Sequence, residues 1–312
     1  MNFKIKYIVS FILCYIGVIS FAHASASLPN NTMRPSQVPE NYVVTPFGYF
    51  HPSCVNKINN DEVVAPGLSI EKNGKEVRRL EKCLFSSFSK QGQERHVDST
   101  ASIHDGWQIS SSYSLDGDLG YLTAVWTVPS DPVINQGQTL YFFPGVEQNP
   151  VISILQPVLG WNQLGRPGWT LASWNCCERG TVTHSEPVKT SAGETNEGKI
   201  YYDDNLNGYY IQSFVNPFTS SKVMTQLGTR HYNRPVNWVL GGVMESYHVA
   251  SCDALPADGA FIFGTVSVYD RKDNLVTKNF KTHLNHGDNC NYKASVSSSK
   301  FPDIKFTFSN DK

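Results

Sequence analysis

The sequence predicts an all-β protein, an antiparallel sandwich of two sheets that follows an N-terminal segment with its own disulfide. Short runs of β-branched and aromatic residues recur over residues 107–269, and clusters of Gly, Pro, Asn and Asp separate them. Helical periodicity is absent from the same stretch. All of the 7 cysteines except Cys14 lie beyond the first 24 residues, a number and placement typical of a disulfide-bonded exported protein.

The chain begins with the pattern of a secretory signal peptide. Two lysines precede an apolar run over residues 8–22, and Ala22-His23-Ala24 has the small-residue spacing that signal peptidase recognises. The run is too short, and too closely followed by polar residues, for a membrane span. We therefore expect cleavage after Ala24, or else after Ala26. The mature protein is expected to be exported, either extracellular or periplasmic, with no membrane span.

Residues 25–100 differ in composition from the rest of the chain and form a separate N-terminal segment. They contain Cys54 and Cys83, which flank one stretch and are expected to pair. Residues 76–85 are rich in Lys, Arg, Glu and Leu, which predicts a helix. Whether this segment is a removable pro-region stays open at this point. Residues 101–312 are then the sandwich domain with a C-terminal extension.

The remaining cysteines predict structural bridges rather than a metal site. Cys252 and Cys290 flank a single segment and are expected to pair. Adjacent Cys176 and Cys177 are not expected to pair with each other, because a disulfide holds its Cα atoms about 4.4–6.8 Å apart. Zinc is excluded because no C-x-x-C pair with histidine partners is present.

The charge balance argues against polyanionic partners. The chain has 26 basic and 27 acidic residues and no basic stripe, so we expect no binding of nucleic acid. Charged residues make up only 17% of the chain, below the roughly 25% of a typical domain. A surface whose solubility depends on uncharged polar residues changes little in charge on acidification. We expect a monomer that uses no cofactor and tolerates an acidic environment.

Several catalytic and metal-binding signatures are absent. There is no G-x-S-x-G nucleophile elbow and no H-E-x-x-H zinc helix. Residues 203–208 resemble the first half of a calcium loop, but Phe214 occupies the position of the bidentate glutamate. We interpret that segment as a hairpin turn.

Two apolar strand-like runs each contain one conspicuous polar residue. Residues 151–157 include Gln156, and residues 241–249 include Glu245. A polar side chain that alternates with apolar neighbours commonly faces solvent. Either residue alone therefore says little about function, and the series of runs has to be considered together.

Taken together, these runs resemble the glutamic peptidases, or eqolisins. Residues 123–129 (T-A-V-W-T-V-P) are similar to the family's T-G-T-F-T-V-P strand, and Ile154-Leu155-Gln156 to its I-L-Q, which carries the catalytic glutamine. Residues 172–174 (A-S-W) resemble A-W-Y, and residues 244–249 (M-E-S-Y-H-V) resemble the strand with the catalytic glutamate. The resemblance covers residues 107–269. It departs from the family at Val146-Glu147-Gln148 and residues 175–178.

The resemblance implies a concanavalin-like sandwich and a secreted acid endopeptidase that acts on polypeptides. Glu245 would deprotonate a water molecule, and Gln156 would stabilise the negative charge that develops on the carbonyl oxygen. Glu147 is the reserve acid, and Trp161 and Trp174 are candidates for the substrate cleft. No metal is implied.

Two other functions are compatible with the sequence. A non-catalytic sandwich that binds glycans or cell-surface polymers would also be rich in aromatic residues. A glycosidase would need two carboxyl groups about 5–9.5 Å apart, for which Glu147 and Glu245 are the candidate pair. The distance between the Gln156 amide and the Glu245 carboxylate distinguishes a peptidase from a binding module, because a binding module has no reason to place the two within hydrogen-bond reach.

Overall fold

The computed structural model describes residues 33–96, 103–148, 153–230, 235–285 and 290–309. The predicted signal peptide, residues 1–24, lies outside this range. Within it the chain forms strands and no α-helix, which confirms the all-β prediction. The short 3₁₀ turns are η1 (Pro52–Cys54), η2 (Gln163–Gly165), η3 (Glu178–Gly180) and η4 (Cys252–Ala254).

Two large sheets form the sandwich, and the described residues place ten strands in the first and nine in the second. The order of the ten-stranded sheet is β22 (Lys293–Val296), β23 (Ile304–Thr307), β20 (Ala260–Asp270), β10 (Leu119–Thr127), β16 (Thr195–Asp203), β17 (Gly208–Val215), β18 (Val223–Arg230), β4 (Val63–Ala65), β5 (Ser69–Lys72) and β6 (Lys75–Arg79). The order of the nine-stranded sheet is β21 (Lys281–Leu284), β9 (Trp107–Ser114), β19 (Val236–Tyr247), β11 (Thr139–Gln148), β12 (Ile154–Trp161), β13 (Trp169–Cys176), β14 (Val182–His184) and β3 (Val55–Lys57), with β15 (Val188–Lys189) also paired to β13.

The main core lies between these two sheets. Leu122 from β10 and Ile211 from β17 meet Phe142 from β11 and Leu159 from β12, and all four side chains are fully buried. Alternation along each strand produces this layer, because successive side chains of a strand point to opposite faces. The other face of the nine-stranded sheet is therefore free to carry different chemistry.

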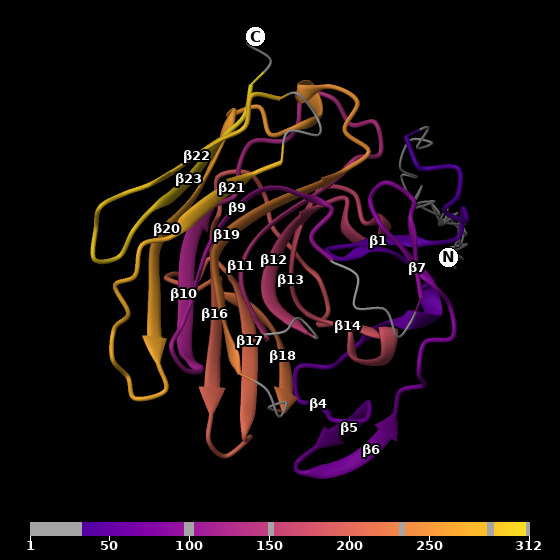
Figure 1. Cartoon of the computed structure of the whole chain (residues 1–312), viewed down its shortest axis with the longest axis vertical. Helices are drawn as coiled ribbons and strands as arrows, with labels where there is room; N and C mark the ends of the chain where they lie inside the picture. The colour runs from indigo at the N-terminus through magenta and orange to yellow at the C-terminus, as the bar shows by residue number, and fades with distance from the viewer. Residues whose placement is uncertain (1–32, 97–102, 149–152, 231–234, 286–289, 310–312) are drawn as a thin grey trace, which may run out of the picture.

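A third layer covers that other face. A small sheet of β1 (Val43–Thr45), β2 (Gly48–Phe50), β7 (Ser87–Phe88) and β8 (Glu94–Arg95) packs on it through a second apolar cluster that includes Phe47, Tyr141 and Trp174. In Figure 1, β1 and β7 lie beside the nine-stranded sheet, on the side away from β10 and β16. The N-terminal segment is thus a cover over one outer face of the sandwich.

The same segment is attached to the edges of both large sheets. β3 pairs in parallel with β14, and β4 pairs in parallel with β18. β5 and β6 extend the ten-stranded sheet beyond β4. Residues 55–79 are therefore joined to the edges of both large sheets by backbone pairing.

The helix predicted for residues 76–85 was wrong. β6 is a strand that pairs with β5, and the chain from Leu80 to Leu84 has no regular structure. All five residues of β6 are exposed, and Leu84 is 83% exposed. Helix propensity is a weak preference that an apolar face must support. This stretch has no such face to bury, so pairing with β5 prevails.

Two predicted disulfides are confirmed. Cys54 pairs with Cys83, with Cα atoms 5.1 Å apart, inside the N-terminal segment. Cys252 pairs with Cys290, with Cα atoms 5.5 Å apart. The second bridge joins the turn after β19 to the C-terminal extension.

The expectation for the third pair was wrong. Cys176 and Cys177 are paired with each other at the end of β13, across a cis peptide bond. The reason is one of elimination: the other four cysteines beyond residue 24 already pair among themselves. No partner from another segment is therefore left for these neighbours among the described residues.

Candidate active site

The face of the nine-stranded sheet beneath the N-terminal segment is called the covered face below. It carries every other side chain of the central strands: those of β11 include Tyr141, Phe143 and Glu147, while Leu140 and Val146 point into the sandwich core. Gln156, Trp174 and Glu245 share this face, as the alternation of their strands requires.

Gln156 lies on β12 and is completely buried. Its register partner on β13 is Trp174, and on its other side it lies next to Gly145, where an added Cβ atom would be 3.5 Å from the Gln156 Cβ. Neither Oε1 nor Nε2 of Gln156 has a hydrogen-bond partner in the structure. Buried polar groups are paired in the great majority of cases, and an unpaired one is costly.

Glu245 lies on β19 opposite Tyr141 of β11, and it is also completely buried. The Tyr247 hydroxyl donates a hydrogen bond of 2.5 Å to its Oε1, whereas Oε2 has no partner. Burial raises the pKa of the Glu245 carboxyl to about 8, against the opposing effect of the Tyr247 hydrogen bond. The backbone of Gly106 approaches so closely that a Cβ atom there would collide with Oε1.

Glu147 lies on β11, and its Oε1 is 2.7 Å from Nε2 of His104. Burial raises the pKa of this carboxyl, and the hydrogen bond and charge of His104 oppose the shift. The His104 ring stacks on Trp107, with centroids 4.0 Å apart, and meets the edge of Trp238. Oε2 of Glu147 has no partner. The carboxyl group is therefore held by one histidine inside an aromatic enclosure.

The strand registers bring Gln156 closer to Glu147 than to Glu245. Glu147 is opposite Ile154 on β12, so Gln156 is its diagonal neighbour, at a Cα separation of roughly 7–8 Å. Glu245 is two strands away from Gln156, and its partner Tyr141 is four residues before Gly145, which is about 13 Å of strand. Gln156 and Glu245 share the covered face but form no hydrogen bond with each other.

The two carboxyl groups are further apart than a glycosidase pair. Glu147 lies on β11 itself, and Glu245 lies on the neighbouring strand β19 opposite Tyr141 of β11. Six residues of strand correspond to about 20 Å, against the roughly 5–9.5 Å of paired glycosidase carboxyls. This separation disfavours the glycosidase interpretation.

The two predicted cleft tryptophans lie on opposite sides of the sheet. Trp174 is on the covered face, where its ring contacts His184 and meets the edge of Phe47. Trp161 lies in the core between the large sheets, against Trp169 at 5.2 Å between ring centroids. The structure therefore places Trp174 with Gln156 and places Trp161 away from it.

The N-terminal segment occupies the space in front of these residues. The Tyr141 hydroxyl donates to the carbonyl of Val44 at 3.0 Å, and Phe47 lies on Trp174. The Tyr49 hydroxyl forms a 2.6 Å hydrogen bond with Nε2 of His248, just beyond β19. No polypeptide can reach Gln156 while this segment is in place.

Sequence reasoning missed Tyr247 and His104. Tyr247 is two residues after Glu245 on the same strand, so the period-two rule would have placed both on one face. His104 lies in an irregular stretch before β9, and no local pattern marks it. Only the tertiary fold brings it to Glu147.

No metal site and no membrane span are found within the described residues. They contain no group of three or more His, Cys, Asp or Glu side chains placed to hold a metal ion. The turn over residues 203–208 is the hairpin between β16 and β17, as predicted. In the same described part of the chain, no helix has the length and apolar character to cross a membrane.

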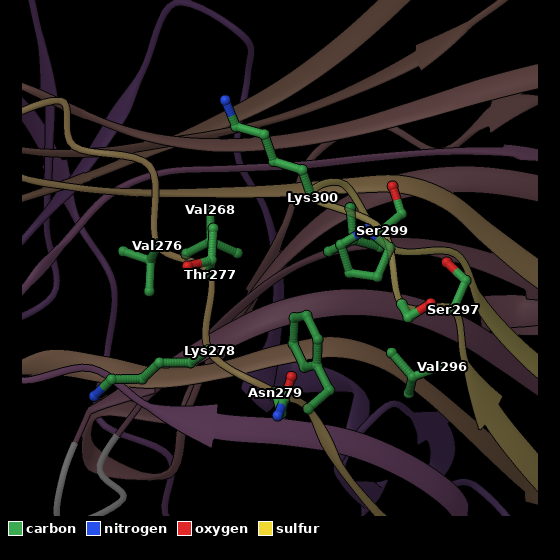
Figure 2. A pocket seen from close by; sticks show the side chains of 13 residues that line it. Val268, Val276, Thr277, Lys278, Asn279, Val296, Ser297, Ser299 and Lys300 are labelled. Atoms are coloured by element: carbon green, nitrogen blue, oxygen red, sulfur yellow. The ribbon is translucent and has the colours of Figure 1, made fainter.

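A separate hollow of about 170 Å³ lies between the C-terminal extension and β20. Serines 297–299 line it together with Lys278 and Lys300, a combination that invites comparison with Ser–Lys hydrolases. Figure 2 shows both lysine side chains extending away from the serines. Lys278 instead forms an ion pair with Asp116 at 2.9 Å. This hollow has no group placed to activate a nucleophile.

Glutamic peptidases are among the solved structures that are similar to this chain. No family model matches the chain, and no curated protein matches it. Scytalido-glutamic peptidase with a peptide-based transition state analog is 13% identical, with a TM-score of 0.44. The same peptidase with a transition state analog inhibitor is 14% identical, with a TM-score of 0.43. SCP-B, an eqolisin in complex with the tripeptide Ala-Ile-His, is 15% identical, with a TM-score of 0.43.

Each match covers 65% of this chain and 98% of the other. The relationship to these peptidases is thus distant and structural.

Proposed function

We propose that this chain is an exported acid endopeptidase that cleaves polypeptides at the covered face. The observation that carries the proposal is the burial of Gln156, Glu147 and Glu245 on one face, each with a polar atom that lacks a hydrogen-bond partner. Buried polar atoms without a protein partner are uncommon, and a catalytic role or bound water is a frequent explanation for them. An amide and two carboxyl groups are suited to peptide hydrolysis by water.

In the proposed reaction Glu245 takes a proton from a water molecule, whose oxygen bonds to the carbon of the scissile carbonyl. Because about 13 Å of β11 separates the positions of Glu245 and Gln156, this assignment requires that the two side chains turn toward each other across the covered face. The Gln156 amide donates a hydrogen bond to the resulting oxyanion, and it can do so at every pH. The carbon–nitrogen bond then breaks, and Glu245 returns its proton to the leaving amine. Glu147, diagonal to Gln156, is the alternative base.

The described form is proposed to be latent, with residues 25–100 as a pro-region. A carboxyl with a pKa of about 8 carries its proton at acidic and neutral pH and cannot serve as a base. Once the segment leaves, water reaches Glu245 and its pKa falls toward that of an ordinary glutamate, since burial is the largest cause of the shift. A substrate would then replace residues 44–50 between Glu245 and Gln156.

The test is proteolysis of a denatured protein substrate by purified chain after removal of the N-terminal segment, from pH 3 to pH 8. Glu245→Gln keeps the shape of the side chain but removes the base, and Gln156→Ala removes the oxyanion donor. Each is expected to lower kcat at least ~100-fold. Because the two residues act as a unit, the double variant is expected to be little worse than the poorer single one.

Glu147→Gln is the matched control for the choice of base. If Glu245 is the base, Glu147→Gln retains most of the activity. If instead Glu147→Gln loses activity and Glu245→Gln retains it, Glu147 is the base. Melting temperatures of all variants establish that they are folded. A wild-type chain that cleaves nothing at any pH after uncovering would refute the peptidase proposal.

A further inference from the structure

Four tyrosines form a row across the outer face of the ten-stranded sheet, on the opposite side of the sandwich from the covered face. Tyr121 on β10 is opposite Tyr269 on β20 and also opposite Tyr201 on β16. Tyr201 in turn is opposite Tyr210 on β17. All four side chains are partly exposed. These residues are called the tyrosine row.

The rings of the row lie close to one another and to the sheet. The ring centroids of Tyr121 and Tyr269 are 6.0 Å apart, and these two rings meet edge to face at an interplanar angle of 65°. The ring centroids of Tyr201 and Tyr210 are 5.6 Å apart, and their planes are tilted by 33°. A Cβ atom on Gly228 would lie 3.0 Å from Cε1 of Tyr210, so that ring covers the backbone of β18. Neighbouring strands are about 4.8 Å apart, so the row spans roughly 14 Å.

A second row of polar side chains runs parallel to the tyrosines. Thr123, Lys199, Gln212 and Gln226 are register partners two residues further along the same strands and β18. Nε2 of Gln212 donates to Oε1 of Gln226 at 2.9 Å and to the Tyr201 hydroxyl at 3.4 Å. The face thus offers aromatic surface beside amide and hydroxyl groups.

Charge on this face is locally balanced. Nζ of Lys199 is 3.1 Å from a carboxylate oxygen of Glu197. Beyond Tyr210 the row opens into a polar hollow of about 450 Å³, where Arg230 is paired with Glu71 at 2.6 Å. A polyanion would need unpaired cations, so the expected ligand is neutral and rich in hydroxyl groups.

We propose that the tyrosine row binds a linear, neutral polysaccharide of β-linked sugars, with its chain running across the strands. The flat C–H faces of such sugars stack on aromatic rings, and hydroxyls at their edges bond to amides such as Gln212. Because the row spans roughly 14 Å, a stretch of a few sugar units is long enough to cover it. The polar hollow beyond Tyr210, which is lined in part by residues 60–74 of the N-terminal segment, receives the end of the chain while that segment is in place.

The test is co-sedimentation of the purified full chain with insoluble cellulose and with insoluble chitin, which share the β-linked backbone. The wild-type protein is expected to partition onto at least one of them. The single variants Tyr121→Ala, Tyr201→Ala and Tyr210→Ala are each expected to weaken the partition roughly tenfold. The triple variant is expected to abolish it.

Two controls separate stacking from general loss of structure. The triple Tyr→Phe variant keeps the aromatic faces and is expected to retain most of the binding. Phe218→Ser changes a 73% exposed aromatic residue outside the row and is expected to have no effect. Absence of wild-type binding to both polymers would overturn the proposal. So would wild-type-like binding by a single or triple alanine variant that melts normally.

Discussion

At the scale of single residues, burial does most to set the chemistry of the covered face. Glu245 and Glu147 both have raised pKa values, and in each case desolvation is the largest cause. The hydrogen bonds from Tyr247 and His104 act in the opposite direction but do not cancel it. Burial therefore governs the protonation of both carboxyl groups.

The raised pKa of Glu245 predicts a pH-dependent stability. Between the ordinary glutamate pKa of 4.5 and the folded value of about 8, the folded state holds a proton that the unfolded state releases. Stability is therefore lost as pH rises through this window, at up to about 1.4 kcal/mol per pH unit from this group. Glu245→Gln has no such loss, so its free energy of unfolding relative to that of wild type is expected to increase from pH 4.5 to pH 8.

The measurement is chemical or thermal unfolding of the full chain and of Glu245→Gln across that range. Lys75→Gln, at an exposed charge on β6, is a suitable control and is expected to show no such trend. A difference between wild type and Glu245→Gln that stays constant with pH would contradict the raised pKa.

Gly106 predicts a second effect at this scale. A Cβ atom there would collide with Oε1 of Glu245 and approach the Tyr247 hydroxyl to 2.6 Å. Gly106→Ala is expected to destabilise the chain by about 1–3 kcal/mol, as overpacking of a buried site does. Gly117→Ala is the matched control, because no atom lies within 4 Å of its added Cβ. Equal melting temperatures for the two variants would show that the site yields without strain.

At the scale of elements, β11 organises the site. It lies between β12 and β19, so it sets the register of Gln156 relative to Glu245. Gly145 allows β12 and its Gln156 to pack closely, because an added Cβ atom there would lie 3.0 Å from the Leu155 carbonyl oxygen and 3.5 Å from the Gln156 Cβ. The N-terminal cover differs from this long central strand, because only short strands, edge pairing and one disulfide hold it in place.

The disulfide of the cover predicts its mobility. Cys54–Cys83 spans 29 residues of sequence, and loops of that size contribute about 3–4 kcal/mol to unfolding free energy. The double variant Cys54→Ser/Cys83→Ser is expected to speed amide hydrogen exchange in β1 and β2. The control is Cys252→Ser/Cys290→Ser, which is expected to loosen the C-terminal extension and leave β1 unchanged. Unchanged exchange in β1 for the first variant would contradict the prediction.

At the scale of the molecule, local pattern predicted the sandwich and failed for the third layer. Strand-like sequence marks these elements locally, as alternation around Leu122 and as a continuous apolar run around Phe142, so the two sheets follow from short-range sequence. The placement of Phe47 on Trp174 depends on contacts more than 100 residues apart, for which no local signal exists. Gln156 and Glu245 were found by resemblance, and their separation across β11 was not foreseeable because register is set by the partner strands.

The charged strand β6 has a consequence for self-association. Four of its five residues are charged and all five are exposed, and it forms one edge of the ten-stranded sheet. Charged edge strands keep a sheet from adding strands of another molecule. A chain freed of its N-terminal segment would lose this guard and expose the backbone of β18 as a new edge. The uncovered form would then be the more prone to aggregate, and the covered form the safer one to store at high concentration.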